Sequence, residues 1–176
     1  MQIQNVVASV DLKTRLPLER LLEELELSEY QPDTFPGLVF RFHDPSATFL
    51  IFQTGKIICV GAGTMKIAKE SLEKLIKRFD SMKLKMPKTY SVKIENIVAT
   101  DNIGKKLNVD ELVFSLHESE YTPDTFPGVV YRISDPKASF LLFSSGRIVC
   151  AGTRSIADAQ RAIDTLVKTL KHIKAI

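Results

Sequence analysis

The chain contains one structural unit written twice. The segment SEYQPDTFPG at residues 28–37 returns as SEYTPDTFPG at residues 119–128, an offset of 91 residues. Pairing residues 1–85 with residues 92–176 needs no gap and gives 32 identical pairs out of 85. A repeat of this length is the size of a domain, which favours a pseudo-two-fold protein over a solenoid of many short repeats. We therefore expect one repeat at 1–91, a second at 92–176, and a binding surface that occurs in two copies.

Composition limits the class of protein. With 176 residues, of which 44% are hydrophobic and 26% are charged, the chain has enough apolar side chains to bury a substantial core. No stretch reaches the roughly 18 consecutive apolar residues of a membrane helix, and the N-terminal segment lacks the pattern of a signal peptide. The sequence predicts a cytoplasmic protein that does not bind a membrane.

Charge is spread evenly along the chain. The net charge is +3, with 13 basic and 11 acidic residues in 1–91, and 11 basic and 10 acidic residues in 92–176. Binding that depends on phosphate neutralisation alone usually shows a concentrated patch of Lys and Arg. We expect more than charge to hold whatever the duplicated surface binds.

Each repeat is predicted to contain a strand, a helix, three strands and a second helix. The first helices begin near Pro17 and Asn108, where apolar residues start to recur at i, i+3 and i+4. Three runs such as GLVFRF, ATFLIF and KIICVG follow, separated by turn residues, which is typical of an antiparallel meander. Each repeat then ends in a long amphipathic helix, with Thr64 as the N-cap in the first repeat and Ser155 in the second. The first long helix carries several basic residues, which we expect to form a solvated face or, as the alternative, a surface for a protein partner. They are Lys66, Lys69, Lys74, Lys77 and Arg78.

No residue pattern indicates catalysis or a metal site. His43, His117 and His172 do not recur at the offset of 91, and the motifs of hydrolases, metalloproteases and phosphate-binding loops are missing. Cys59 and Cys150 occupy the same repeat position inside apolar runs, which favours buried reduced thiols over a disulfide or metal ligands. We expect neither an enzyme nor a cofactor.

Strand alternation defines a candidate binding face. Residues two apart on a strand share a face, although alternation alone does not say which face meets the helices. If the face below is uncovered, it is apolar over more area than a soluble monomer exposes without a partner. Its members are Asn5, Val7, Leu50, Phe52, Lys56, Ile58 and Val60 in the first repeat, and Asn96, Val98, Leu141, Phe143, Arg147, Val149 and Ala151 in the second.

The order of these motifs resembles the core of the TATA-box-binding protein family, particularly its archaeal form. The resemblance rests on IQNVV, EYQPDTFPGLVFR, LIFQTGK and ICVG in the first repeat and on their counterparts in the second, and it extends over essentially the whole chain. It implies an α+β fold in which two repeats form a pseudo-two-fold saddle. One curved antiparallel sheet of about ten strands would lie with its concave face on the DNA minor groove and its helices on the convex face.

The resemblance also implies roles for the residues of this face. Phenylalanine rings would wedge between base steps at each end of the bound site, and an apolar floor would disfavour the amine that a G·C pair places in the minor groove. The wedges would be Phe35, Phe52, Phe126 and Phe143. The floor would be Asn5, Val7, Leu50, Ile58, Val60, Asn96, Val98, Leu141, Val149 and Ala151, with both Asn donating to bases. Phosphates would be contacted by Arg41, Lys56, Arg132 and Arg147.

A member of this family is expected to act as a general transcription initiation factor on TATA-box DNA, associated with the nucleoid of an archaeon. The resemblance implies that it recruits transcription factor B and RNA polymerase. The sequence leaves open a homodimer that covers the sheet face when the protein is free of DNA. Transcription factor B would bind at Tyr121, Thr122, Asp124 and Thr125.

The chain departs from the family pattern in three places. One is a loop where the family carries basic residues: the first repeat has His43 and Ser46 there, while the second keeps Lys137. After each Cys the family usually carries Thr-Gly-Ala-Lys, whereas this chain has Val60 and Ala151 in place of the two Thr. Where the family shows Glu-Pro-Glu, the second repeat has Thr122-Pro123-Asp124. Two alternatives therefore remain: a divergent paralogue with relaxed DNA specificity, and a scaffold that uses the same sheet face to bind protein instead of DNA.

Overall fold

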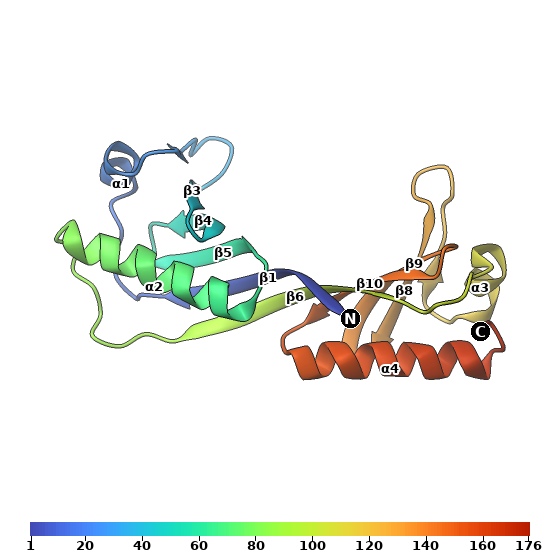
Figure 1. Ribbon diagram of the computed structural model, residues 1–176. Coiled ribbons are helices and arrows are strands. Elements are labelled where there is room, and N and C mark those ends of the chain that lie inside the picture. Colours follow the sequence, from blue (N-terminus) through green and yellow to red (C-terminus); the bar gives the residue numbers. More distant parts are fainter. The chain divides into compact units, whose positions relative to one another are not determined.

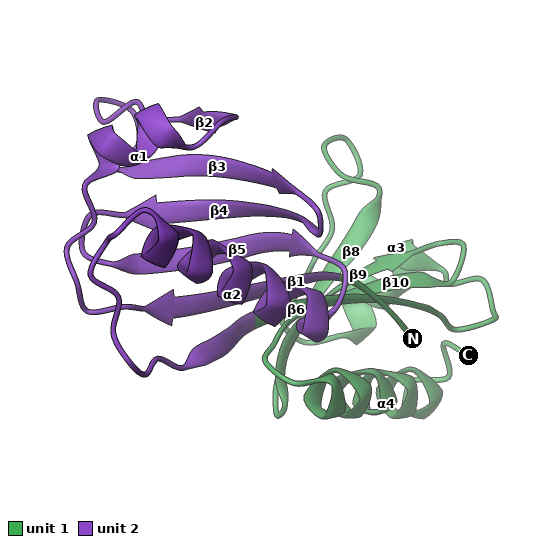
Figure 2. Cartoon of the chain, turned by 60° about the vertical axis from the view of Figure 1, so that its left-hand side comes forward, with its two compact units in different colours: residues 1–4, 96–176 green, residues 5–95 purple.

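The computed structural model describes residues 1–176, which divide into two compact units (Figure 2). Unit 2 comprises residues 5–95, and unit 1 comprises residues 1–4 together with 96–176. The strand that opens each repeat therefore contributes its first few residues to the other unit. The predicted repeat boundary after residue 91 stays a prediction.

Ten strands form one antiparallel sheet, in the order β2-β3-β4-β5-β1-β6-β10-β9-β8-β7. The first repeat supplies β1 (Gln2–Asp11), β2 (Ser28–Glu29), β3 (Gly37–His43), β4 (Ser46–Phe52) and β5 (Lys56–Ala62). The second supplies β6 (Val92–Asn102), β7 (Ser119–Glu120), β8 (Gly128–Ser134), β9 (Lys137–Phe143) and β10 (Arg147–Thr153). The predicted fold class, an antiparallel sheet of about ten strands with helices, is confirmed.

Four helices accompany the sheet: α1 (Leu18–Glu24), α2 (Met65–Ser81), α3 (Val109–Ser115) and α4 (Ile156–His172). The two long helices begin where the sequence predicts. The Thr64 hydroxyl accepts a hydrogen bond from the Ile67 backbone at 3.1 Å, and Ser155 accepts one from the Asp158 backbone at 3.0 Å. These N-cap bonds satisfy backbone donors that the first helical turn leaves without partners.

In unit 2 the core lies between α2 and one face of the strands (Figure 1). The helix buries Leu72, Leu75 and Phe79, and alternate strand residues complete the layer. Phe49 is fully buried and stacks on Phe40, with ring centroids 6.1 Å apart. Phe49 therefore belongs to the core of unit 2.

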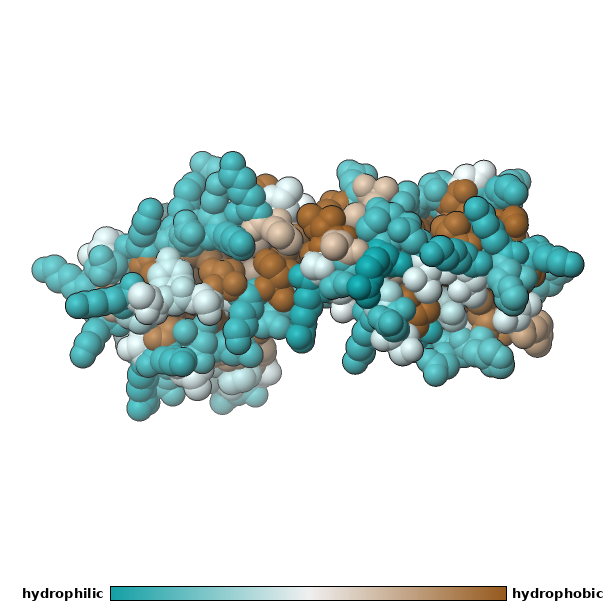
Figure 3. Space-filling model, turned by 90° about the horizontal axis from the view of Figure 1, so that it is seen from below, coloured by the Kyte–Doolittle hydropathy of each residue, from teal (hydrophilic) through white to brown (hydrophobic).

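Unit 1 repeats this packing with α4, which lies along β9 and β10 (Figure 1). Leu166 and Leu170 of the helix are buried with Phe140 of β9 in one apolar cluster. The outer surface of α4, seen in Figure 3, is largely hydrophilic. Only one face of each unit's strands is therefore covered by its long helix.

Both cysteines lie inside these cores. Cys59 and Cys150 are free and fully buried, and burial raises the pKa of both thiols to about 11. The prediction of buried reduced thiols is confirmed.

The basic side chains of α2 divide into two kinds. Its four lysines at 66, 69, 74 and 77 are exposed, as expected of a solvated face. Arg78 instead packs back on the protein, because its guanidinium lies 5.6 Å from the Phe40 ring centroid and donates to the Glu24 carbonyl at 3.3 Å. None of the helices is long and apolar enough to span a membrane.

Candidate nucleic-acid interface

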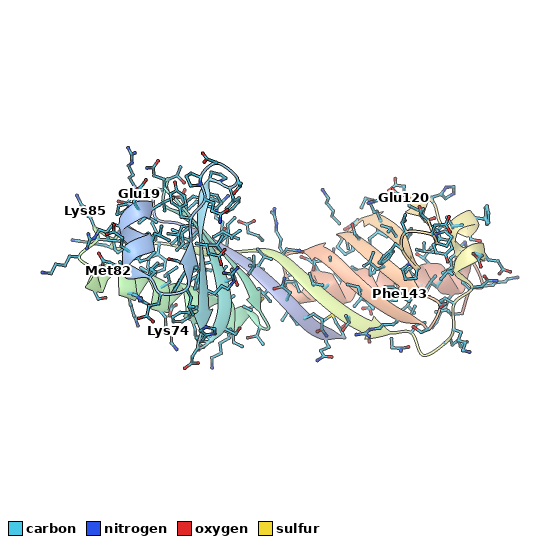
Figure 4. The ribbon with its side chains drawn as sticks, turned by 90° about the horizontal axis from the view of Figure 1, so that it is seen from above. Glu19, Lys74, Met82, Lys85, Glu120 and Phe143 are labelled. Carbon is cyan, nitrogen blue, oxygen red and sulfur yellow. The ribbon has the colours of Figure 1, made fainter.

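The face of the strands that the long helices leave uncovered carries the predicted site residues. On β4, Phe49 and Ile51 are buried, while Leu50 and Phe52, which alternate with them, are half-exposed. The same alternation occurs on β9, and Figure 4 looks onto this open face in unit 1, where Phe143 is labelled. Every predicted floor residue is half-buried on this face, unit by unit: Asn5, Val7, Leu50, Ile58 and Val60 in unit 2, and Asn96, Val98, Leu141, Val149 and Ala151 in unit 1.

Strand register aligns the apolar residues into rows. In unit 2, Val39 lies opposite Leu50, which lies opposite Ile58. The matching row in unit 1 runs from Val130 through Leu141 to Val149. Sequence reasoning missed Val39 and Val130, although the alternation within GLVFRF and GVVYRI places both on the open face.

Two pairs of phenylalanines stand beside these rows with nearly the same geometry. The rings of Phe35 and Phe52 have centroids 5.8 Å apart at an angle of 66°, and those of Phe126 and Phe143 are 5.8 Å apart at 63°. Such edge-to-face pairs are a favourable arrangement of aromatic rings. Because all four rings remain half-exposed, each pair presents an apolar edge to solvent.

A glycine lies beneath each pair. A Cβ atom on Gly37 would lie 2.7 Å from a ring carbon of Phe35 and 3.1 Å from one of Phe52. On Gly128 the distances to Phe126 and Phe143 would be 2.9 and 3.1 Å. The sequence shows a Pro-Gly step after Phe35 and Phe126. Only the structure shows that the absent side chain of the glycine makes room for the rings.

The two asparagines are fixed by backbone groups of the neighbouring strand. Asn5 Oδ1 accepts a hydrogen bond from the Gly61 N–H at 2.9 Å, and Asn96 Oδ1 accepts one from the Gly152 N–H at 2.8 Å. The strand register shifts here, and both glycines have positive φ, at +84° and +97°, as in a β-bulge. Because each amide oxygen is engaged, the Nδ2 group of each asparagine is left to donate to a ligand.

The two positions that lack the family's threonine have hydroxyl neighbours. Val60 lies opposite Thr48 in register, and Ala151 lies opposite Ser139. Both hydroxyl residues are half-buried on the open face. Sequence reasoning did not include them, yet they supply polar groups one strand away from the missing threonines.

The predicted phosphate contacts fall into two classes. Lys56 and Arg147 are exposed at the start of β5 and β10. Arg41 is instead paired with Glu29 at 2.6 Å, and Arg132 is paired with Glu120 at 2.7 Å. The two glutamates were not among the predicted site residues.

The predicted site for transcription factor B lies on the loop before β8. The backbone N–H groups of Thr125 and Phe126 donate to the Thr122 carbonyl at 3.0 and 2.9 Å, so the loop is a tight turn that positions Phe126. Thr122, Asp124 and Thr125 are exposed together on this turn. Tyr121 differs, because it packs against the apolar core of unit 1.

Comparison with known proteins gives consistent matches over most of the chain. A family model described as "Transcription factor TFIID (or TATA-binding protein, TBP)" matches residues 1–82 and 91–173. The TATA-box-binding protein of Pyrococcus abyssi is 41% identical over 171 residues, which cover 97% of this chain and 90% of that protein. The TATA-box-binding protein of Thermococcus celer is 41% identical over 176 residues, or 100% and 93% of the two chains. The solved structure of Methanococcus jannaschii TBP superposes with a TM-score of 0.91 at 38% identity, covering 97% of this chain and 98% of that one.

Proposed function

Because the chain belongs to the TATA-binding protein family, we propose that its open sheet face binds the minor groove of TATA-like promoter DNA and kinks it. Family membership makes the protein a general transcription initiation factor and not an enzyme. The observation that carries the proposal is the two matching phenylalanine pairs, each set over a glycine on a face whose central rows are apolar.

The apolar rows suit the floor of a widened minor groove. Leu50, Ile58 and their neighbours meet sugars and base edges without offering hydrogen-bond partners. A G·C pair would bury its N2 amine against them unpaired, whereas A·T pairs present only acceptors there. The free Nδ2 groups of Asn5 and Asn96 donate to such acceptors, either adenine N3 or thymine O2. The face therefore favours A·T pairs through both attraction and exclusion.

The phenylalanine pairs supply the kinks. Inserting a ring between base steps costs a few kcal/mol of stacking, which is offset by apolar contact along the bent groove. The glycine beneath each pair lets both rings pack closely at the strand end. The rings therefore lose little conformational freedom when they bind. Each unit carries one pair, which gives one kink per unit.

Cations on the same face then hold the backbone of the bent duplex. Lys56 and Arg147 extend from exposed positions and contact phosphates on either strand. Arg41 and Arg132 contact phosphates in the same way once their ion pairs with Glu29 and Glu120 are broken.

Further partners follow from the family resemblance. The exposed turn at Thr122, Asp124 and Thr125 is proposed to bind transcription factor B, and through it RNA polymerase. When DNA is absent, a second copy of the chain is proposed to cover the apolar face, because an exposed apolar surface of this kind favours self-association.

The proposal is tested by fluorescence transfer between the ends of a labelled TATA duplex, with a G·C-rich duplex as the comparison. The protein should increase transfer on the TATA duplex. Phe143→Ala should reduce that change and weaken binding by roughly 5- to 150-fold, since stacking of an aromatic ring on a base contributes about 1–3 kcal/mol. The matched control is Phe114→Ala in the same unit, because Phe114 is 90% exposed and belongs to α3, not to a strand of the open face. Bending by Phe143→Ala equal to that of the unchanged protein would contradict the wedge assignment.

A second candidate is a divergent paralogue with relaxed DNA preference. Val60 and Ala151 favour it, because both positions lack a hydroxyl that would select central base pairs. An equal increase in fluorescence transfer on the TATA and G·C-rich duplexes would support this candidate. No increase on either duplex would support the alternative of a scaffold that binds protein instead of DNA.

A further inference from the structure

We infer that Glu29 and Glu120 restrain the outer arginines of the open face and thereby suppress binding to duplexes that the protein cannot bend. The inference rests on the proposed function, since it concerns how the same face discriminates between DNA sites.

The geometry is the same in both repeats. Glu29 Oε1 accepts a hydrogen bond from an Arg41 guanidinium nitrogen at 2.6 Å, and Glu120 Oε1 accepts one from Arg132 at 2.7 Å. The two pairs are separated by the repeat offset of 91 residues. Both distances are short, as is usual for a charge-assisted hydrogen bond.

Strand register places the pairs on the DNA-facing side. Glu29 lies opposite Val39, and Arg41 follows Val39 by two residues on β3, so all three share the open face. In unit 1, Glu120 lies opposite Val130 on β8, which also carries Arg132. Figure 4 labels Glu120 and Phe143 in the view onto this face. Each pair therefore occupies the outer two strands of its unit, on the same face as the phenylalanine pair. It lies further along the strand, because Phe52 is opposite Gly37 at the start of β3, whereas Arg41 is opposite Thr48.

The pairs are too exposed to be explained as stabilising devices. The side chains of Arg41 and Glu29 are 51% and 60% exposed, and those of Arg132 and Glu120 are 48% and 67% exposed. Exposed ion pairs contribute little to folding. A ligand that offers phosphate oxygens can therefore open them readily.

The charge of each pair determines what approaching DNA meets. Attraction between a protein and any duplex is set mainly by the phosphates it neutralises. With each outer arginine balanced by a carboxylate, this edge of the face is neutral towards straight DNA. Only a duplex bent onto the phenylalanine wedges brings its phosphates close enough to replace the carboxylates. The glutamates therefore penalise non-cognate binding more than cognate binding.

The test compares the unchanged protein with the double variant Glu29→Gln and Glu120→Gln on TATA and G·C-rich duplexes across a series of salt concentrations. Glutamine keeps the shape of the side chain and removes its charge. We expect the G·C-rich duplex to bind about 3- to 10-fold more tightly. The slope of log affinity against log salt concentration should steepen by about 2, since each phosphate gained adds close to 0.9. The TATA duplex should gain less, so the ratio of the two affinities falls.

Two controls make the result specific. Glu19→Gln with Glu111→Gln removes the same charge from exposed positions on α1 and α3, and should leave the salt dependence unchanged. In a background of Arg41→Ala and Arg132→Ala, the two glutamine substitutions should have no further effect, because the groups they release are gone.

Other outcomes overturn the inference. An unchanged ratio of affinities, or an equal gain from the control substitutions, would show that only net charge matters. If the unchanged protein bends TATA DNA but the double variant has the same ratio of TATA to G·C-rich affinity, only this inference fails. If the unchanged protein bends neither duplex, the proposed function fails as well.

Discussion

At the scale of single residues, the same side chain has different consequences according to the face it occupies. Phe140 is fully buried beneath α4, Phe143 is half-exposed on the open face, and Phe114 is 90% exposed on α3. Burial and not residue type therefore determines what each phenylalanine contributes to folding.

The first residue-scale prediction compares two of these rings. Phe140→Ala should lower the free energy of unfolding by about 3–5 kcal/mol, since it leaves a cavity in the core. Phe114→Ala should change it by no more than about 0.5 kcal/mol, as is usual for an exposed site. Urea denaturation of both variants checks this, and a large loss with Phe114→Ala would mean that α3 packs against something in solution.

The second residue-scale prediction concerns the centre of the open face. Val60→Thr together with Ala151→Thr should tighten binding to the TATA duplex, because each new hydroxyl can form one hydrogen bond of about 1 kcal/mol net. Together they correspond to about a 30-fold gain at most. Titration of the labelled TATA duplex measures it. No gain would indicate that Thr48 and Ser139, which lie opposite these positions in register, already satisfy the central bases.

At the scale of secondary structure elements, α2 and α4 each begin at a capping side chain that can be recognised in the sequence. Thr64→Ala or Ser155→Ala should each lower the free energy of unfolding by about 1 kcal/mol, the usual contribution of an N-cap. Ser81→Ala is the matched control at the other end of α2, where the hydroxyl only donates to the Arg78 carbonyl. Thermal unfolding distinguishes them, and equal losses at both ends of α2 would contradict the capping argument.

Most elements could be predicted because their signals are local. Alternation along β4 and β9 and helical spacing in α2 and α4 depend on residues close together in the sequence. The two-residue strands β2 and β7 are too short to alternate, and sequence reasoning missed them. The Asn5 bond to Gly61 joins residues 56 apart, and the Glu29 pair depends on the same short β2. These parts of the candidate site required knowledge of which strands are neighbours.

At the scale of the whole molecule, duplication gives the two units nearly the same open face. The phenylalanine pairs differ by only 3° in ring angle, and acidic and basic residues are divided almost evenly between the repeats. A ligand with its own approximate two-fold symmetry, such as a short A·T-rich duplex, therefore meets few features that distinguish one unit from the other.

This near equality predicts that the protein alone binds a TATA duplex in both orientations. Because the native thiols are buried, a single cysteine introduced by Lys168→Cys on the exposed side of α4 can carry one fluorophore on unit 1. Acceptors placed at one or the other end of the duplex then report the orientation of each complex. We expect two populations within about threefold of each other, since a tenfold preference requires about 1.4 kcal/mol of difference between the units. Transcription factor B should shift the distribution towards one orientation, because the turn that is proposed to bind it differs between the repeats: Thr122 corresponds to Gln31, although Asp124 is repeated as Asp33. A single orientation without any partner would show instead that small differences such as Val60 against Ala151 are enough to orient the complex.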